Sequence, residues 1–202
     1  MIVAGLTGSI AMGKSTVGRM FAELGAPVFD SDAAVREFYR SDEAEAVEAA
    51  FPGVRLDGDV DRCRLSAATL GDPTALRRLE EIVHPDVARR RIAFLAAAAA
   101  AGRRVAVVDV PLLFETGGEA TVDVVVVVSA GPEAQRRRAL SRPGMTEAKL
   151  AAILARQTPD AEKRCRAHCV IDTRGPYPAT RSQVAALLRA LAAVPGRRTL
   201  DA

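Results

Sequence analysis

A glycine-rich segment near the start of the chain limits the possible folds more than any other part of the sequence. Residues 8–15 read Gly-Ser-Ile-Ala-Met-Gly-Lys-Ser, which is glycine, four residues, glycine, lysine and serine. The β-forming run Ile2–Thr7 precedes this segment, and apolar residues at helical spacing follow it. The order predicts that the chain opens with a buried strand, a tight turn and a helix of an α/β fold.

The residue types in this segment suit the binding of a phosphate chain. Gly8 and Gly13 let the backbone curl so that N–H groups converge on phosphate oxygens, near the positive end of the following helix. Lys14 would reach the β and γ phosphates, and the Ser15 hydroxyl would ligate Mg²⁺. A chance glycine-rich turn is the alternative. The candidate residues for binding a nucleoside triphosphate are Gly8, Ala11, Met12, Gly13, Lys14, Ser15 and Thr16.

The remaining hydrophobic pattern alternates short strands with helices. Further strands are expected at Pro27–Phe29, Val105–Val110, Val122–Val128 and Val170–Ile171, and the valine run of the third fits a strand covered on both faces. Helices are expected up to Gly25 and at 31–38, 132–141, 146–157, 160–167 and 179–193. This alternation predicts a three-layer α/β fold with a five-stranded parallel sheet.

Two stretches of the chain lack this alternation. Residues 42–101 show helical patterns broken by proline and glycine and no convincing strand, so we expect a helical insertion there. Residues 195–202 are expected to fray.

Composition and charge exclude several classes of protein. With 202 residues, 49% of them hydrophobic, the chain fits one packed domain, with or without an insertion. The net charge of +3 does not indicate nucleic acid or a membrane as partner. The longest apolar stretch, Ile92–Ala101, is too short to span a bilayer, and no secretion signal is visible. We expect a cytoplasmic protein with no obligate protein partner.

The three cysteines are expected to be free thiols, and Cys165 and Cys169 to be buried or half-buried. Cys165, His168 and Cys169 lie close together in the sequence. Their spacing matches no common zinc finger and a fourth ligand is missing, so a metal site is the less favoured alternative.

Carboxylates at strand ends point to phosphoryl transfer. The chain contains no asparagine, so it lacks the motif with which regulatory GTPases read guanine, whereas small kinases fit its length. A kinase needs a carboxylate at the acceptor hydroxyl, and Asp30 and Asp32 follow the second strand. Either could instead cap the next helix. Asp109 ends another strand, where it could hold Mg²⁺ through water or cap a turn.

Several segments, in order along nearly the whole chain, resemble the dephospho-CoA kinase family. This resemblance is specific, because few other small kinases share the set. Its residues are Gly5–Ile10 running into Gly13–Val17, Phe29–Asp32, Val83–Pro85, Asp109–Glu115, Arg138, Arg142, Arg156–Gln157 and Val170–Asp172.

The resemblance implies ATP-dependent phosphorylation of the ribose 3′-hydroxyl of dephospho-CoA, with Mg²⁺, to give CoA and ADP. It implies that Asp32 is the catalytic base and that Asp30 and the helix-start residue His84 bind substrate. The alternative for His84 is that it simply packs. Residues from about 42 to 101 would form the CoA-side region, and those from about 135 to 167 a lid over ATP. The remaining core is expected at about 1–41, 102–134 and 168–194.

The lid would bring two arginines to the transferring phosphate. Arg138 and Arg142 lie four residues apart, so they are expected to share a helix face and to act in catalysis with Lys14. The alternative is a solvated arginine run that includes Arg136 and Arg137.

Two positions depart from the family pattern. Ala11 stands where the family often has glycine, so its backbone must adopt a conformation that an L-residue tolerates. Thr173 stands where asparagine is common, which leaves the adenine contacts open. The alternatives in function are a kinase of another small hydroxyl substrate, such as shikimate or a nucleoside monophosphate, and a non-catalytic nucleotide-binding module.

Overall fold

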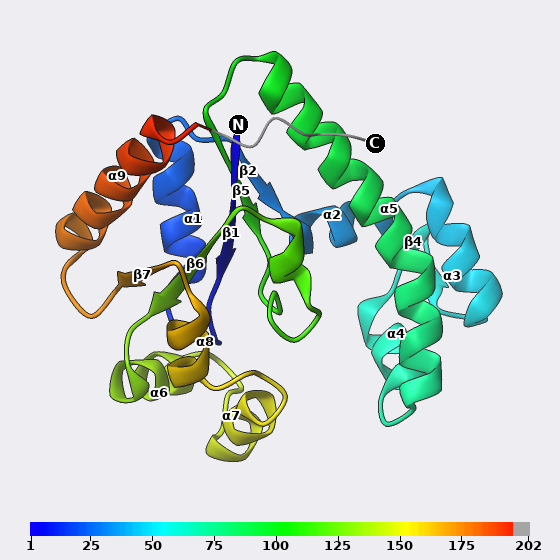
Figure 1. Ribbon diagram of the computed structural model, residues 1–202. Coiled ribbons are helices and arrows are strands. Elements are labelled where there is room, and N and C mark those ends of the chain that lie inside the picture. The colour runs from blue at the N-terminus through cyan, green and yellow to red at the C-terminus, as the bar shows by residue number, and fades with distance from the viewer. Residues whose placement is uncertain (196–202) are drawn as a thin grey trace. The chain divides into compact units, whose positions relative to one another are not determined.

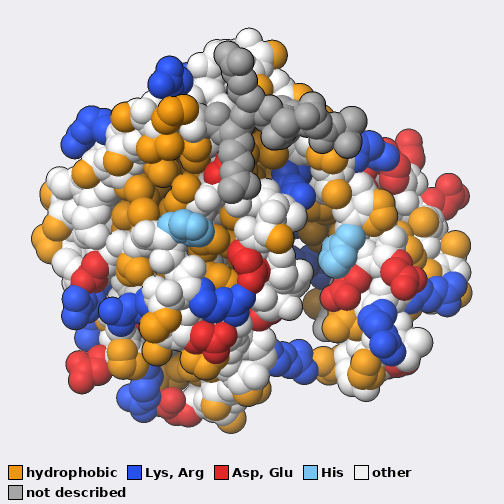
Figure 2. All heavy atoms as spheres, in the orientation of Figure 1, with side chains coloured by type: hydrophobic (Ala, Val, Ile, Leu, Met, Phe, Trp, Pro, Cys, Tyr) orange, Lys and Arg blue, Asp and Glu red, His pale blue; other side chains and the backbone are white. Residues whose placement is uncertain are grey.

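The computed structural model describes residues 1–195, which fall into two compact units. One unit is formed by Met1–Phe29 and the chain from Ala98 on, and the other by Asp30–Ala97. No helix within residues 1–195 is both long and apolar enough to cross a membrane. The expected fraying concerns residues that lie, except for Pro195, outside the described part. On the face drawn in Figure 2, basic and acidic side chains are interspersed.

The first unit is built on a five-stranded sheet with the strand order β2-β5-β1-β6-β7 (Figure 1). Central β1 pairs in parallel with β5 and β6, and β6 pairs in parallel with β7. The strands are β1 (Ile2–Thr7), β2 (Val28–Asp30), β5 (Val105–Asp109), β6 (Val124–Ser129) and β7 (Cys169–Asp172). The predicted α/β class and five-stranded parallel sheet are confirmed.

Strand β6 is covered on both faces, as its valine run predicts. Val126 and Val128 pack in a cluster with residues of α1 (Lys14–Glu23) and α9 (Tyr177–Ala193). Val125 and Val127 pack on the opposite side, against Leu113 and Phe114 of the chain that follows β5. Successive strand residues face opposite sides of a sheet, so an unbroken valine run is stable only between two apolar layers.

The connection between β6 and β7 carries three short helices. They are α6 (Pro132–Leu140), α7 (Glu147–Leu154) and α8 (Asp160–Arg166). Arg142 lies beyond the end of α6, so the prediction that it shares a helix face with Arg138 is wrong. The physical reason is Pro143, because a proline disfavours helical backbone in the residue before it.

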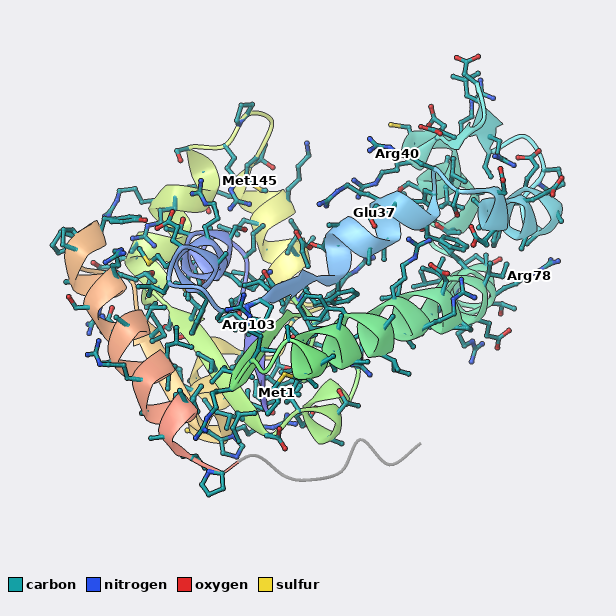
Figure 3. All side chains as sticks on the ribbon, turned by 90° about the horizontal axis from the view of Figure 1, so that it is seen from above. Met1, Glu37, Arg40, Arg78, Arg103 and Met145 are labelled. Atoms are coloured by element: carbon teal, nitrogen blue, oxygen red, sulfur yellow. The ribbon has the colours of Figure 1, made fainter. Side chains whose placement is uncertain are left out.

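The second unit has its own apolar core. Its elements are α2 (Ser31–Phe38), a 3₁₀ turn (Asp42–Ala44), α3 (Glu45–Ala50), β3 (Arg55–Leu56), β4 (Asp59–Val60), α4 (Arg62–Thr69) and most of α5 (Pro73–Ala100). Phe38, Val47, Phe51 and Leu79 pack in the core. Glu37 of α2, labelled in Figure 3, pairs with Arg90 of α5 at 3.6 Å.

The expectation of no strand in 42–101 is wrong, because β3 and β4 form a small antiparallel hairpin. Asp57 and Gly58 join the strands with φ values of 51° and 92°. Positive φ at both central residues is typical of tight hairpin turns, for which Asp-Gly is a preferred pair. Strands of two residues are too short to display a visible alternation.

The expected helix start at His84 is also wrong, since α5 runs unbroken from Pro73 to Ala100 and contains Pro85. Proline removes one hydrogen bond from a helix interior. Packing holds the helix together on both sides of this position: Val83 is buried in the core, and buried Asp86 accepts hydrogen bonds from Arg89 and Arg90.

Candidate active site

The glycine-rich segment forms a curled loop between β1 and α1. Within it, Met12 N–H donates to Ser9 C=O at 3.2 Å, and α1 begins at Lys14 after Gly13, whose φ is 94°. Thr16 and Val17 donate to Gly13 C=O. The first N–H groups of a helix have no carbonyl one turn earlier to bind, so those at the start of α1 suit an anion.

Close packing explains why the first glycine of the loop is needed. A Cβ atom at Gly8 would lie 2.7 Å from the carbonyl oxygen of Val128 in β6. Backbone atoms cannot move aside as a flexible side chain can, so a side chain here would push the loop off the sheet.

Lys14 forms an ion pair with Asp109 at the end of β5. Both side chains are mostly buried. The pairing of β1 with β5 places Asp109 opposite Leu6. The structure therefore brings together two predicted site residues, Lys14 and Asp109. The sequence predicted that Asp109 holds Mg²⁺ or caps a turn, and its contact with Lys14 was not predicted.

The oxygen donors near Lys14 fit Mg²⁺. Asp109 Oδ2 lies 3.6 Å from the position a Cβ atom would take at Gly18 of α1. Ser15 precedes Gly18 by three residues, so its hydroxyl belongs to the same side of the helix. A hydroxyl and a carboxylate are the hard oxygen ligands that Mg²⁺ prefers. The metal role of Ser15 and Asp109 stays a prediction.

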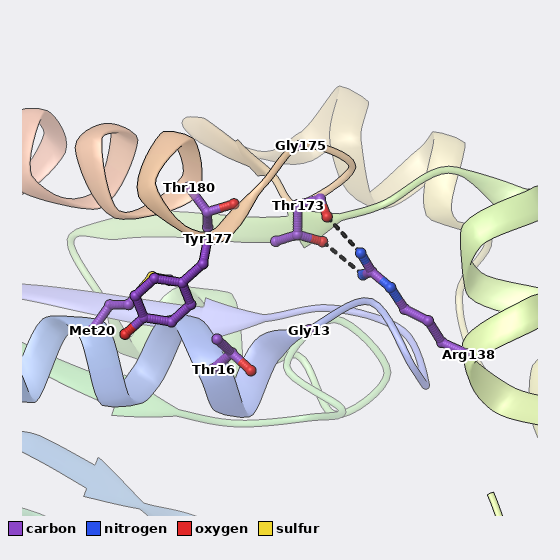
Figure 4. A pocket seen from close by; sticks show the side chains of 8 residues that line it. All are labelled: Gly13, Thr16, Met20, Arg138, Thr173, Gly175, Tyr177 and Thr180. Atoms are coloured by element: carbon purple, nitrogen blue, oxygen red, sulfur yellow. Dashed lines mark hydrogen bonds between the residues drawn. The ribbon is translucent and has the colours of Figure 1, made fainter. Parts of the chain in front are cut away.

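A pocket of about 260 Å³ lies beside the start of α1 (Figure 4). It is lined by the first turns of α1 and α9, by the loop between β7 and α9, and by one side chain of α6. The lining residues are Gly13, Thr16, Met20, Arg138, Thr173, Gly175, Tyr177 and Thr180.

Thr173 joins three parts of this pocket. Its hydroxyl donates to Met12 C=O in the loop at 2.7 Å. Arg138 donates to the Thr173 hydroxyl at 3.1 Å and to its carbonyl at 2.6 Å, as Figure 4 shows. The guanidinium of Arg138 is thus held at the pocket wall, and its predicted contact with the transferring phosphate stays a prediction, as does that of exposed Arg142.

The predicted acceptor-side residues belong to the other unit. Asp30 caps α2 by accepting the Ala33 N–H at 2.9 Å, as one of its alternatives predicts, and it lies 3.7 Å from Arg36. Asp32 is exposed in the first turn of α2. His84 is exposed on α5. Their roles in catalysis and substrate binding stay predictions.

Comparison with known proteins adds a second line of evidence. A profile of the dephospho-CoA kinase family matches residues 1–178. The chain belongs to the dephospho-CoA kinase family.

Individual relatives agree with this membership. The chain is 58% identical over 188 residues to a dephospho-CoA kinase from Mesorhizobium japonicum, covering 93% of this chain and 95% of the relative. It is 56% identical over 198 residues to one from Rhodopseudomonas palustris, covering 98% and 100%. A crystal structure from Thermus thermophilus superposes with a TM-score of 0.82 at 32% identity, covering 96% of this chain and 98% of that chain.

The backbone at Ala11 differs from the expectation that it takes a conformation an L-residue readily tolerates. Its φ is 62°, in the left-handed region that non-glycine residues seldom occupy. Its methyl group is buried in a cluster with Ala139 of α6 and Leu150 of α7. Burial of the methyl group offsets part of the backbone strain.

A buried ion pair near the site was not predicted from the sequence. Lys163 of α8 is fully buried and lies 2.8 Å from Glu115 Oε1, which also accepts the Thr158 N–H at 2.7 Å. Burial acts to raise the pKa of Glu115, but the hydrogen bonds from Lys163 and from backbone N–H groups outweigh it and hold the pKa below its ordinary value. Glu115 has a place in the family motif, but only the fold reveals its partner.

The cysteines are free. Cys169 is half-buried as expected, but Cys165 is exposed, as is Cys63. Short helices and an edge strand carry them, where one side faces solvent. Within residues 1–195, no group of three or more metal-ligating side chains is arranged to hold a metal ion.

Proposed function

We propose that this chain transfers the γ-phosphoryl group of ATP to the ribose 3′-hydroxyl of dephospho-CoA, and that the products are CoA and ADP. Family membership supports the acceptor. The observation that carries the proposal is the complete phosphate loop at the end of the central strand, with Lys14 beside the carboxylate of Asp109. A cytoplasmic location is part of the same proposal.

Lys14 changes its partner in this proposal. In the structure its ammonium group pairs with Asp109. A triphosphate offers more negative charge than one carboxylate, so it draws the lysine toward the β and γ phosphates. Asp109 can then hold Mg²⁺ with the Ser15 hydroxyl. When bound, the metal neutralises negative charge on the phosphate oxygens.

The pocket beside α1 suits the base of ATP. It continues from Gly13 and Thr16, so a nucleotide whose phosphates lie in the loop can extend into it. Tyr177 and Met20 offer apolar surface, and the aromatic ring of Tyr177 can stack on the base. These two residues are the proposed adenine contacts.

Asp32 is proposed as the catalytic base. Its carboxylate would accept the proton of the 3′-hydroxyl while the hydroxyl oxygen bonds to the γ-phosphorus, and the bond from that phosphorus to the bridging oxygen breaks to release ADP. Asp30 and His84 would contact dephospho-CoA. Residues 135–167 would close over ATP and exclude water, with Arg138 and Arg142 stabilising charge on the phosphoryl group.

The experiment that tests this proposal is ADP release with a panel of acceptors. Dephospho-CoA, shikimate and nucleoside monophosphates are each incubated with the protein, ATP and Mg²⁺, and the products are identified by mass spectrometry. We expect ADP in step with a gain of one phosphate on dephospho-CoA. Phosphorylation of another acceptor in preference to dephospho-CoA would favour a different kinase. ATP binding without ADP from any acceptor would favour a passive nucleotide-binding module.

A further inference from the structure

Two glutamine side chains form hydrogen bonds to the backbone of one phosphate-loop residue, Ile10. Gln157 Oε1 accepts the Ile10 N–H at 3.1 Å, and Gln135 Nε2 donates to the Ile10 C=O at 2.9 Å. Gln135 belongs to α6 and is 7% exposed, and Gln157 follows α7. The chain contains three glutamines, so two of them meet at this single loop residue.

These contacts fix the orientation of two consecutive peptide groups. The peptide group is planar and trans, so its N–H and C=O point in opposite directions. When Gln135 holds the Ile10 C=O, the N–H of Ala11 must point the other way. The peptide before Ile10 is held at both ends, by Gln157 at its N–H and by Met12 N–H at the Ser9 carbonyl.

Apolar packing joins the same two segments. Ile10 and Ala11 pack in a cluster with Ala139, Leu140, Met145, Leu150 and Leu154, which come from α6, α7 and their connection. Met145 is labelled in Figure 3. The tip of the loop is therefore covered by the predicted lid segment through side chains and bound to it through backbone groups.

We infer that Gln135 and Gln157 are positioning residues that set the direction of the loop N–H groups for ATP. The glutamines stand near the two ends of the helix pair α6–α7, so a shift of this pair changes the loop. The inference rests on the proposed binding of ATP at this loop. The two amides act through Ile10, so their loss should weaken ATP binding and leave dephospho-CoA binding unchanged.

Replacement by glutamate separates the two contacts by their polarity. A carboxylate can still accept the Ile10 N–H, so Gln157→Glu keeps its contact. A carboxylate cannot donate to the Ile10 C=O, so Gln135→Glu loses this hydrogen bond. It also places a carboxylate oxygen against the carbonyl oxygen of Ile10. Both variants add one negative charge near the same loop residue, so charge repulsion of ATP is matched. Because Gln135→Glu loses one hydrogen bond that Gln157→Glu keeps, we expect Kd for ATP to rise about three- to tenfold more in Gln135→Glu than in Gln157→Glu.

The measurements are Kd for ATP by titration calorimetry, KM for both substrates, and Tm. The control is Asp123→Ala, which removes the hydrogen bond that the Val3 N–H donates to Asp123 at the start of β1, at the opposite end of that strand from the loop. We expect it to lower Tm but to leave Kd for ATP within about twofold of the wild-type value. Gln157→Met and Gln135→Met should each raise KM for ATP about three- to tenfold, with KM for dephospho-CoA within about twofold.

Equal Kd values for ATP in the two glutamate variants would overturn the inference. A rise in both KM values together, reproduced by Asp123→Ala, would also overturn it, because a purely structural role would then suffice. Calorimetry keeps this test separate from the proposed function. If wild-type protein binds ATP but does not phosphorylate dephospho-CoA, the proposed function fails, and the order of the Kd values still decides the role of the glutamines.

Discussion

Lys14 provides the first test at the level of single residues, because it is the cation that the proposed function places at the β and γ phosphates. We expect Lys14→Ala to remain folded and to lose about 10²- to 10³-fold in kcat, as expected when one charged donor to the transferring group is removed. A coupled assay for ADP measures this loss. Lys149→Ala is the matched control, because Lys149 is exposed and its Nζ bonds only the Gly144 carbonyl among the contacts described for it. Full activity of Lys14→Ala would contradict the proposed role.

Asp32 provides a second test at this scale. Asp32→Asn keeps the size of the side chain but cannot take the hydroxyl proton, so kcat should fall about 10²- to 10⁴-fold with little change in KM for ATP. Asp123→Asn is the control, since asparagine can still accept the Val3 N–H and Asp123 has no part in the proposed site. Near-normal turnover of Asp32→Asn with dephospho-CoA would show that the base is another group.

Ala11 tests how opposing effects balance at one position. Glycine would relieve the strain of the left-handed backbone, which stabilises the fold by about 1–2 kcal/mol. Two effects destabilise it: the loss of a buried methyl group, about 0.8 kcal/mol, and the higher entropy of the unfolded chain, about 0.4–1 kcal/mol. These contributions nearly cancel, so Ala11→Gly should change the free energy of unfolding by less than about 1 kcal/mol. Urea denaturation measures it, and a loss above about 2 kcal/mol would contradict the balance.

Local motifs were readable from the sequence at this scale, whereas partners across the chain were not. The loop pattern and the cap at Asp30 follow from spacing and residue type, whereas the left-handed backbone of Ala11 was not expected. The contacts of Gln135 and Thr173 join residues more than a hundred positions apart. No local pattern predicts such a contact. Glutamine is rare in this chain, however, so each of the three glutamines stands out in the sequence.

Elements were predicted best where a periodic pattern is long or extreme. The valine run predicted a strand buried on both faces, and the structure confirms it. Two features led to wrong predictions. Pro85 suggested a helix start, but packing keeps α5 helical on both sides of this proline. The hairpin at Asp57-Gly58 was missed because each of its strands has only two residues. Tertiary contacts decide such cases, and a single sequence does not display them.

The ion pair between Lys163 of α8 and Glu115, which follows β5, gives a prediction about how two elements hold together. Glu115→Gln leaves the ammonium of fully buried Lys163 without a charged partner, so the free energy of unfolding should fall by about 3 kcal/mol at pH 7. Glu119→Gln is the control: Glu119 pairs with Arg166 in a more exposed setting, so its loss should be at most about 1 kcal/mol. Equal losses in the two variants would contradict the account.

The Glu115 pair should also make stability depend on pH. The pKa of Glu115 is lowered in the folded state, so its contribution is complete above its unfolded pKa, about 4.3, and is lost as the pH falls through the folded value. Urea denaturation of the wild type and of Glu115→Gln should therefore converge in acid. A gap between them that stays constant from pH 7 to pH 3 would contradict this.

At the scale of the whole molecule, the alternation of strands and helices was enough to predict the sheet and its class. The division into units was not predicted in detail, since the second unit begins at Asp30 and the insertion was expected from about 42. Phe38 explains the difference, because it packs with Val47 and Leu79 and so brings α2 into that unit. The chain therefore leaves the sheet at Asp30, two residues before the proposed base.

Proton–phosphorus correlation NMR of the product formed from dephospho-CoA, ATP and Mg²⁺ decides whether the ribose 3′-hydroxyl is the acceptor. We expect a new phosphomonoester signal correlated with the ribose H3′ proton, in an amount equal to the ADP released. Phosphate on a different oxygen, or ADP and inorganic phosphate with unchanged dephospho-CoA, would rule out the proposed reaction.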